Sequence, residues 1–406
     1  MRILFVADTY YPHINGVYYF MQRLAERLQA AGHTVAVLAP SDELLYTNKV
    51  VEGIRVFGMP SFPLLMYKTI RIPVPLALHA RIDMVYTAFN PDILHLQNHF
   101  TINKAALAVN KKHGIPVIGT NHFMTENFTP FYHFLRMDSK IEKIMWAAFS
   151  KVFNQMDLVT TPTETGAELI RPKLHVKVVA VSNGIDLVRF NKTGGYTNIR
   201  KKYGIPDMPI LLFVGRLDPE KNIGEVLEAV ARLADKDFCF VIAGKGTIRP
   251  ALEKQVEKLG LAGKVVFTGF VSNDDLPQLY HISRCYVTAS VAELQSIATM
   301  EAMACGLPVI AANAGALPEL VHNTENGFLF NPGDLNTLSK SIVAIFEDHQ
   351  WRKMRQCSLD IIAPHDINNT VRAYEKWHAN CIAKKNHSSL VKIGTIATEF
   401  KQLAMS

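Results

Sequence analysis

A repeated alternation of short apolar runs and amphipathic stretches constrains the fold of this 406-residue chain more than any other feature. The apolar runs have the length of strands, and amphipathic segments such as residues 17–31 follow them with helical spacing. Strands that are apolar on both faces and are joined through helices form parallel sheets covered on both sides. In the first half, the first expected strand ends at Val6 and the others span residues 34–39, 54–57, 93–97, 116–120, 158–161 and 176–181.

The same alternation starts a second time near residue 210. The connector between the two series begins with Ser182-Asn183-Gly184-Ile185-Asp186 and continues as a polar, turn-rich run to Gly204. We therefore predict an α/β protein with two Rossmann-like domains facing a cleft, which is the expected ligand site. The expected bounds are 1–182 for an N-terminal domain, 183–365 for a C-terminal domain, and 366–406 for a helix that crosses back to the first domain, plus a tail. The expected strands of the second series span residues 210–215, 238–243, 265–268, 285–289, 309–312 and 328–331.

Composition narrows the class of protein. A hydrophobic content of 49% and a charged content of 19% are typical of a globular chain. The five cysteines are scattered and form no C-x-x-C pair, so we expect buried, reduced thiols and a cytoplasmic protein. The first 180 residues hold 18 Lys and Arg against 13 Asp and Glu, whereas the remainder holds 25 against 23. A basic first half is compatible with an anionic membrane surface or a phosphorylated ligand, and equally with ordinary solubility charge.

Two carboxylates, Glu293 and Glu301, lie eight positions apart in the stretch 289–312. If both were on one helix, they would fall within about 80° of each other and about 12 Å apart. That separation is too large for a shared proton but suits two ends of one ligand. The alternative is that both are solvated surface acids, since Glu is seldom buried.

Three turns at strand ends offer groups that bind phosphate. The first turn, around Gly16, is not G-x-G-x-x-G, so the fingerprint of nicotinamide-dinucleotide binding is absent. It could still offer backbone N–H groups to a ligand, and the alternative is a structural turn that only caps the helix. Arg216 and Lys221 lie between a buried strand and a helix start, which suits a diphosphate, although a solvated charged loop gives the same pattern. Gly244 permits a close backbone approach at the end of the next strand.

Histidines and a lysine-rich helix mark the first domain. His99 and His122 follow strand ends, where side chains face the crevice, and their polar surroundings favour hydrogen bonding to a substrate over metal binding. Residues 60–82 are apolar with only cationic charges, which fits a membrane surface. The helix expected over 139–156 fits either a membrane surface or a core-facing helix with a solvated lysine face, and its acceptor or membrane candidates are Lys140, Lys143 and Trp146.

With these motifs in order, residues 1–380 or so resemble the retaining glycosyltransferases of family 4, which have the GT-B architecture. The resemblance rests on Y-P-x-x-N-G near the start, N-G-I-D at 183–186, G-R-L-D-P-E-K-N at 215–222, the E-x7-E pair, and E-A-M-A-C-G-L-P-V-I at 301–310. It implies catalytic roles for His122 and Glu293, which would contact the donor sugar. It implies that donor-binding groups come from Gly16, Arg216, Lys221, Gly244, Gln295, Ser296, Ile297 and Glu301. Among these, Arg216 and Lys221 would hold the diphosphate, and Glu301 would bind the ribose. The resemblance also implies that 1–182 is the acceptor-binding domain and 183–365 the nucleotide-sugar-binding domain.

The E-x-Q form at 293–295, N-H-F at 98–100 and T-N-H-F-M-T-E-N at 120–127 are most similar to transferases that glucosylate diacylglycerol. Ser296 stands where the family usually has Gly, and Gln295 where it often has an aromatic residue, so we expect Ser296 to narrow the sugar site or shift donor choice. The resemblance implies a UDP-sugar donor, a lipid or sugar acceptor, no metal or other cofactor, no nucleic-acid partner, and a peripheral position on the cytoplasmic membrane. The alternatives are a soluble sugar, polysaccharide or protein acceptor, or a nucleotide-sugar epimerase.

Overall fold

The computed structural model describes residues 1–12, 16–64, 67–122, 139–191, 193, 198–347 and 351–403. These residues form two compact units. Unit 1 is made of Met1–His122, Lys140–Val181 and Asn368–Ser406, and unit 2 includes Ser182–Ile367. The chain therefore enters unit 2 after Val181 and leaves it after Ile367.

Unit 1 is built on a sheet of eight strands. The apolar composition of the central strands explains their position, since all but the first residue of β1 is fully buried. The strands are β1 Arg2–Val6, β2 Thr34–Pro40, β3 Thr47–Val51, β4 Ile54–Met59, β7 Ile93–Leu96, β8 Val117–Thr120, β9 Leu158–Thr161 and β10 Val178–Ala180. Their order is β10-β9-β8-β7-β1-β2-β4-β3, and every pair is parallel except β3 with β4. A separate antiparallel hairpin is formed by β5 Ser61–Leu64 and β6 Tyr67–Pro73.

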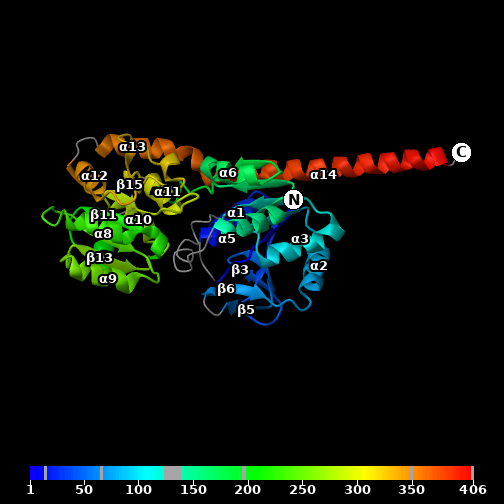
Figure 1. Ribbon diagram of the computed structural model, residues 1–406, viewed down its shortest axis with the longest axis horizontal. Coiled ribbons are helices and arrows are strands. Elements are labelled where there is room, and N and C mark those ends of the chain that lie inside the picture. Colours follow the sequence, from blue (N-terminus) through cyan, green and yellow to red (C-terminus); the bar gives the residue numbers. More distant parts are fainter. Residues whose placement is uncertain are drawn as a thin grey trace. The chain divides into compact units, whose positions relative to one another are not determined.

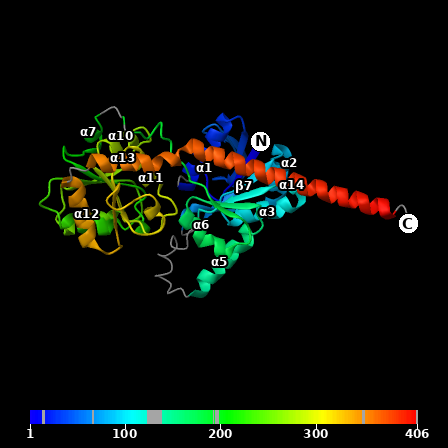
Figure 2. The same ribbon diagram turned by 90° about the horizontal axis from the view of Figure 1, so that it is seen from above.

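Helices of unit 1 connect these strands and cover the sheet. They are α1 Gly16–Ala30, α2 Leu78–Phe89, α3 Thr101–His113, α5 Ser139–Phe153, α6 Glu164–Ile170, the short 3-10 helix η2 Arg171–Lys173, and α14 Ile367–Leu403. The first turns of α14 pack Val371, Tyr374 and Cys381 into the core of unit 1. Its C-terminal part continues as a straight rod past the body of the unit (Figure 1, Figure 2).

Unit 2 is built on a six-stranded sheet with every pair parallel. Its strands are β11 Ile210–Val214, β12 Cys239–Ala243, β13 Val265–Gly269, β14 Cys285–Thr288, β15 Val309–Ala312 and β16 Gly327–Phe330, in the order β13-β12-β11-β14-β15-β16. The helices are α7 Ile199–Tyr203, α8 Ile223–Ala231, α9 Arg249–Lys258, α10 Leu276–His281, α11 Ile297–Ala304, α12 Leu335–Glu347 and α13 Trp351–Ile362, with 3-10 turns η3 Pro219–Lys221, η4 Leu317–Glu319 and η5 Ala363–His365. The strand order reverses direction between β11 and β14, which is where α/β sheets bind ligands.

The fold confirms the prediction of two Rossmann-like α/β domains. The expected strands appear within a residue or two of their predicted bounds, but the sequence reading missed β3 and the β5–β6 hairpin. Four of the five cysteines are buried, and all five are free thiols. Among the described residues, no helix combines the length and apolarity that crossing a membrane requires.

Candidate functional site

Two glycine-containing loops of unit 2 touch where β11 and β12 end. A Cβ added at Gly244 would lie 1.8 Å from the carbonyl oxygen of Gly215, and one at Gly246 would lie 2.2 Å from that of Leu217. The backbone N–H of Leu217 donates to the carbonyl of Lys245 over 2.9 Å, so the two loops run in contact beyond the strands. Gly244 was predicted to permit a close approach, and the neighbour that it admits here is the loop at 215–217.

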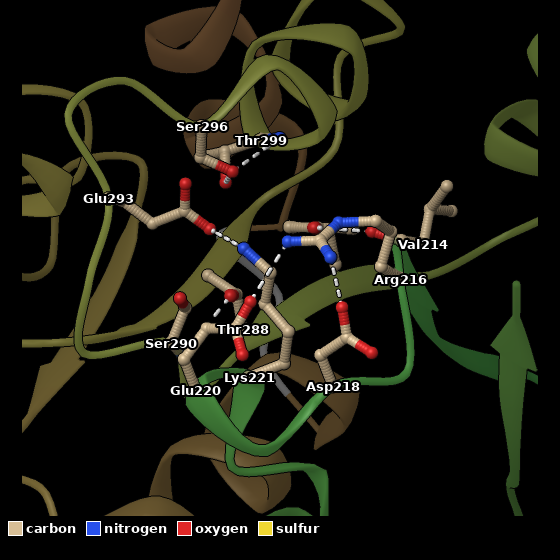
Figure 3. A network of polar contacts seen from close by, with 11 residues as sticks. Val214, Arg216, Asp218, Glu220, Lys221, Thr288, Ser290, Glu293, Ser296 and Thr299 are labelled. Carbon is tan, nitrogen blue, oxygen red and sulfur yellow. Dashed lines mark hydrogen bonds and ion pairs between the residues drawn. The ribbon is translucent and has the colours of Figure 1, made fainter. Parts of the chain in front are cut away.

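Of the two predicted cations, Arg216 lies in this loop and Lys221 follows it, and both face carboxylates (Figure 3). Arg216 is 60% exposed and pairs with Asp218 and, over 3.0 Å, with Glu220. Lys221 is far less accessible, with 16% of its side chain exposed, and its Nζ lies 2.6 Å from Oε1 of Glu293. An incoming diphosphate would therefore compete with these carboxylates or share the cations with them.

Glu293 is fixed both at its side chain and at its backbone. Its side chain is 14% exposed and holds Lys221, while its carbonyl oxygen accepts from the N–H of Ala316 over 2.9 Å. A Cβ at Gly315, whose φ is +54°, would come within 2.7 Å of the same carbonyl oxygen. The helical spacing predicted for Glu293 and Glu301 is wrong, because α11 begins only at Ile297 and Glu293 lies in the loop before it.

Glu301 is on α11 and is buried, with 5% of its surface exposed. The hydroxyl of Tyr280, on α10, donates to its Oε2 over 3.1 Å. Burial and the adjacent Glu301 raise the pKa of Tyr280 well above its ordinary value, so the phenol stays a donor. Tyr280 thus holds Glu301 and Lys221 holds Glu293, so the two carboxylates are fixed by different elements, as two grips on one ligand would require.

Ser296 caps the start of α11. Its hydroxyl oxygen accepts from the backbone N–H of Thr299 over 3.3 Å and from the Thr299 hydroxyl over 2.8 Å. Such a cap satisfies one of the free N–H groups of the first turn, which begins at Ile297. The Ser296 hydroxyl is therefore engaged in holding the helix start. The neighbouring Gln295 is 6% exposed, and its Oε1 accepts from the backbone N–H of Asn183 over 2.8 Å.

In unit 1, His122 lies at the end of β8 as expected from the sequence. Its Nε2 donates to Oε1 of Gln97 over 2.9 Å, and its ring lies 5.1 Å from that of Phe20. Burial lowers the pKa of His122 to about 3, so the imidazole is neutral near pH 7 and Nδ1 keeps a lone pair. Gly16 is the first residue of α1, and residues 13–15 of its predicted loop lie outside the described residues.

The acceptor candidates lie in and beside α5. His99 is 5% exposed and its ring meets that of Phe149 edge to face at 5.3 Å, while burial lowers its pKa to about 4. Trp146 is 9% exposed and contacts Phe149 at 5.2 Å. Lys143 is exposed, and the side chain of Lys140 lies outside the described residues. The aromatic face of α5 therefore packs inward, as the core-facing alternative predicted, with Lys143 on the solvated side.

Several residues of the site carried no signal in the sequence. Tyr280 is far from Glu301 along the chain, and nothing in its own helix marks it as a partner of that carboxylate. Asp218 and Glu220 lie inside the predicted motif, but only the structure shows that they pair with Arg216. Among the described residues, no group of three or more His, Cys, Asp or Glu side chains is arranged to hold a metal ion.

Comparison with known proteins matches both halves of the chain. Residues 14–189 match the family described as Glycosyltransferase Family 4, and residues 196–358 match Glycosyl transferases group 1. The chain is 28% identical over 359 residues to the sulfoquinovosyl transferase SQD2 of Arabidopsis thaliana, covering 86% of this chain and 68% of that protein. It is 27% identical over 393 residues to the alpha-monoglucosyldiacylglycerol synthase of Streptococcus pneumoniae, covering 90% and 87%.

A solved structure of the same fold is Anabaena Alr3699/HepE in complex with UDP and glucose. It superposes with a TM-score of 0.74 over 93% of this chain and 99% of that one, at 19% sequence identity. At that identity the likeness concerns the fold. Together with the two family matches it accounts for both units of the chain.

Proposed function

Because the chain belongs to the family 4 glycosyltransferases with the GT-B fold, and is therefore a hexosyltransferase, we propose that it transfers glucose from UDP-glucose to a hydroxyl of diacylglycerol at a membrane surface. The observation that carries the acceptor is the likeness to the pneumococcal alpha-monoglucosyldiacylglycerol synthase, which extends over 90% of this chain. SQD2, a sulfoquinovosyl transferase, is similar over 86% of the chain.

The donor half of the proposal rests on the charged groups of unit 2. Lys221 and Arg216 would hold the diphosphate, Glu301 the ribose hydroxyls, and Glu293 the hexose. Positive charge from these side chains and from the start of α11 would stabilise the negative charge that develops on the leaving diphosphate. These groups supply that stabilisation without a metal ion, and we propose that none is required.

The proposed reaction breaks one bond and forms one. The acceptor oxygen bonds to the anomeric carbon as the bond from that carbon to the diphosphate oxygen breaks, and the acceptor proton passes to the leaving phosphate. Attack from the same face as the leaving group would retain the anomeric configuration. His122, held neutral by its lowered pKa, would contact the hexose as a hydrogen-bonding group. His122→Ala should therefore lower kcat, which steady-state kinetics would measure; an unchanged kcat would remove His122 from the mechanism.

An exposed apolar patch on unit 1 supports a lipid acceptor. We define it as Leu44, Leu45 and Phe62, whose exposures are 71%, 72% and 43%. The two segments that carry it are tied together, because the N–H of Ser61 donates to the carbonyl of Glu43 over 3.2 Å. Exposed hydrophobic side chains gathered in one place are typical of sites that meet a membrane or a partner.

Two measurements test the proposal. The purified protein is incubated with a panel of radiolabelled nucleotide sugars and a total lipid extract, and label is followed into the organic phase. We expect label from UDP-glucose in a diacylglycerol-derived lipid. Label that enters only water-soluble products would point to a soluble acceptor, and turnover of the sugar with no acceptor would point to an epimerase.

The second measurement is flotation with vesicles of neutral or anionic lipid. The double variant Leu44→Asp, Leu45→Asp should lose vesicle binding and lipid glucosylation while keeping UDP binding. Val188→Asp is the matched control, since Val188 is 79% exposed but lies in unit 2. Equal binding of both variants to vesicles would remove the patch from the proposal.

A further inference from the structure

The chain crosses between its units after Val181 and again after Ile367, and these two crossings are joined inside unit 2. Residues just after the first crossing pair with residues just before the second, because Ile185 and Asp366 form a parallel bridge. The N–H of Ile185 donates to the carbonyl of His365 over 2.8 Å, and the N–H of Ile367 donates to the carbonyl of Ile185 over 2.9 Å. We call residues 182–185 and 365–367 the junction.

Gln295 reaches this junction from the loop that carries Glu293. Its Oε1 accepts from the N–H of Asn183 over 2.8 Å, and its Nε2 donates to Oγ of Ser182 over 3.1 Å. Nε2 also lies 3.5 Å from Nδ1 of His365. Gln295 and Asn183 are 6% and 7% exposed. A buried carboxamide that has both its oxygen and its nitrogen matched is a strong local constraint, because losing either partner leaves a desolvated polar group.

The donors and acceptors of this cluster balance in one arrangement. Burial lowers the pKa of His365, which favours the neutral imidazole, and the tautomer with its proton on Nε2 leaves Nδ1 as an acceptor. The Ser182 hydroxyl lies 2.8 Å from that nitrogen and can donate to it, while its oxygen accepts from Nε2 of Gln295 and, over 3.2 Å, from the N–H of Gly184. A glutamate in place of Gln295 has no N–H to give to Ser182 or His365 and would bury a charge.

Gln295 lies between two groups assigned to the donor sugar. Glu293 is held by Lys221 on one side, and Ser296 caps α11 on the other. On the α11 side of this short segment, two side chains hold the loop. Ser296 caps the helix, and the Gln295 carboxamide binds the junction. Its position sets where the N–H groups at the start of α11 and the Glu293 carboxylate stand.

We propose, on the basis of the proposed donor site, that Gln295 is a positioning residue which clamps the loop at 293–296 to the junction, and that its side chain does not contact the donor. The clamp orders the part of the site that meets the hexose. The groups assigned to the nucleotide lie outside the clamped loop: Lys221 ends η3, and Glu301 lies on α11, where Tyr280 donates to it. Loss of the clamp should therefore affect the sugar more than the nucleotide.

The test compares two ligands by calorimetry, UDP and the UDP-sugar that the wild-type protein binds in a panel. Gln295→Ala should keep the Kd for UDP within about twofold while raising the Kd for the UDP-sugar, or lowering kcat, by roughly tenfold or more. Gln356→Ala is the matched control, because Gln356 is exposed and its carboxamide donates to the side chain of Asp360 on the same helix, over 2.8 Å. It should change neither value.

Further variants separate positioning from a general loss of structure. Ser182→Ala and His365→Ala should reproduce the Gln295→Ala pattern, and the double variant Gln295→Ala, His365→Ala should be no worse than Gln295→Ala alone. Fully additive losses, or an equal loss of UDP and UDP-sugar affinity, would overturn the proposal. So would a Kd for the UDP-sugar and a kcat that both stay within about twofold of wild type in Gln295→Ala. The acceptor is absent from the binding assay, so failure of lipid glucosylation would not be mistaken for failure of the clamp.

Discussion

Replacing Glu301 by glutamine should weaken nucleotide binding while leaving the fold intact. Glu301 is 5% exposed on α11, and Tyr280 donates to one of its two oxygens over 3.1 Å. An ionised carboxylate has about four acceptor positions, and adjacent hydroxyls such as those of ribose can each donate to it. Glutamine keeps the volume but loses the charge and half of the acceptors.

The size of the effect follows from the kind of bond that is lost. Hydrogen bonds to charged groups contribute about 1.5–3 kcal/mol, which corresponds to roughly a 10- to 150-fold rise in Kd for UDP. Tyr280→Phe should have a smaller effect in the same direction, and the double variant should show a coupling energy, since the two groups are in contact.

Calorimetry with UDP and with 2′,3′-dideoxy-UDP measures this directly. Wild type should prefer UDP, and Glu301→Gln should lose most of that preference. Glu257→Gln, on the exposed end of α9, is the control and should bind UDP like wild type. If Glu301→Gln still discriminated between the two nucleotides as wild type does, the assignment of Glu301 to the ribose would be refuted.

Three further predictions concern the helix cap, the metal and the response to acid. Ser296→Ala should lower the free energy of unfolding by about 1 kcal/mol and Ser296→Gly by only a few tenths, measured by urea denaturation, because alanine removes the cap and glycine is tolerated there. Activity should survive EDTA; loss with chelator and rescue by a divalent ion would contradict the metal-free proposal. The free energy of unfolding should fall as pH drops from about 6.5 toward 4, by on the order of 1 kcal/mol per pH unit for each buried histidine. The reason is that the pKa values of these imidazoles are lowered in the folded chain, so over this range they bind protons only when the chain unfolds. Asp8, whose pKa is raised to about 6 by burial, opposes this trend below pH 6, and His378→Leu should make the slope shallower; an unchanged slope would argue against the lowered pKa. The histidines concerned are His95, His99, His122 and His378.

The parallel strands of both units could be predicted because they are apolar on both faces, which is a strong local signal. β3 was missed because its central residues, Asn48, Lys49 and Val50, are exposed, so it lacks the apolar run of an inner strand. The β5–β6 hairpin was missed because residues 60–82, which are apolar with only cationic charges, were interpreted as a loop at a membrane surface. The sequence predicted a helix followed by a tail over 366–406 without deciding whether the tail is helical, because its helical pattern is weak, and α14 continues to Leu403.

The motifs located the residues of the site but not all of their contacts. Lys221 and Glu301 were found from short patterns, since each follows a strand end or lies on a helix with a recognisable spacing. The helical relation assumed for Glu293 was wrong, because the loop from 289 to 296 depends on Ala316 and Lys221, which are distant in sequence. The engagement of the Gln295 side chain could not be predicted either, since Ser182 and Asn183 lie more than a hundred residues before it and His365 lies 70 residues after it.

The central claim is that the nucleotide-sugar site of this chain serves glucosylation of a lipid. The most direct measurement incubates the purified protein with UDP-glucose and vesicles containing diacylglycerol, and follows UDP release together with the mass and anomeric configuration of the lipid product. The account predicts one hexose added to diacylglycerol for each UDP released, with the α configuration of the donor retained. Release of UDP without a glucosylated lipid would contradict it.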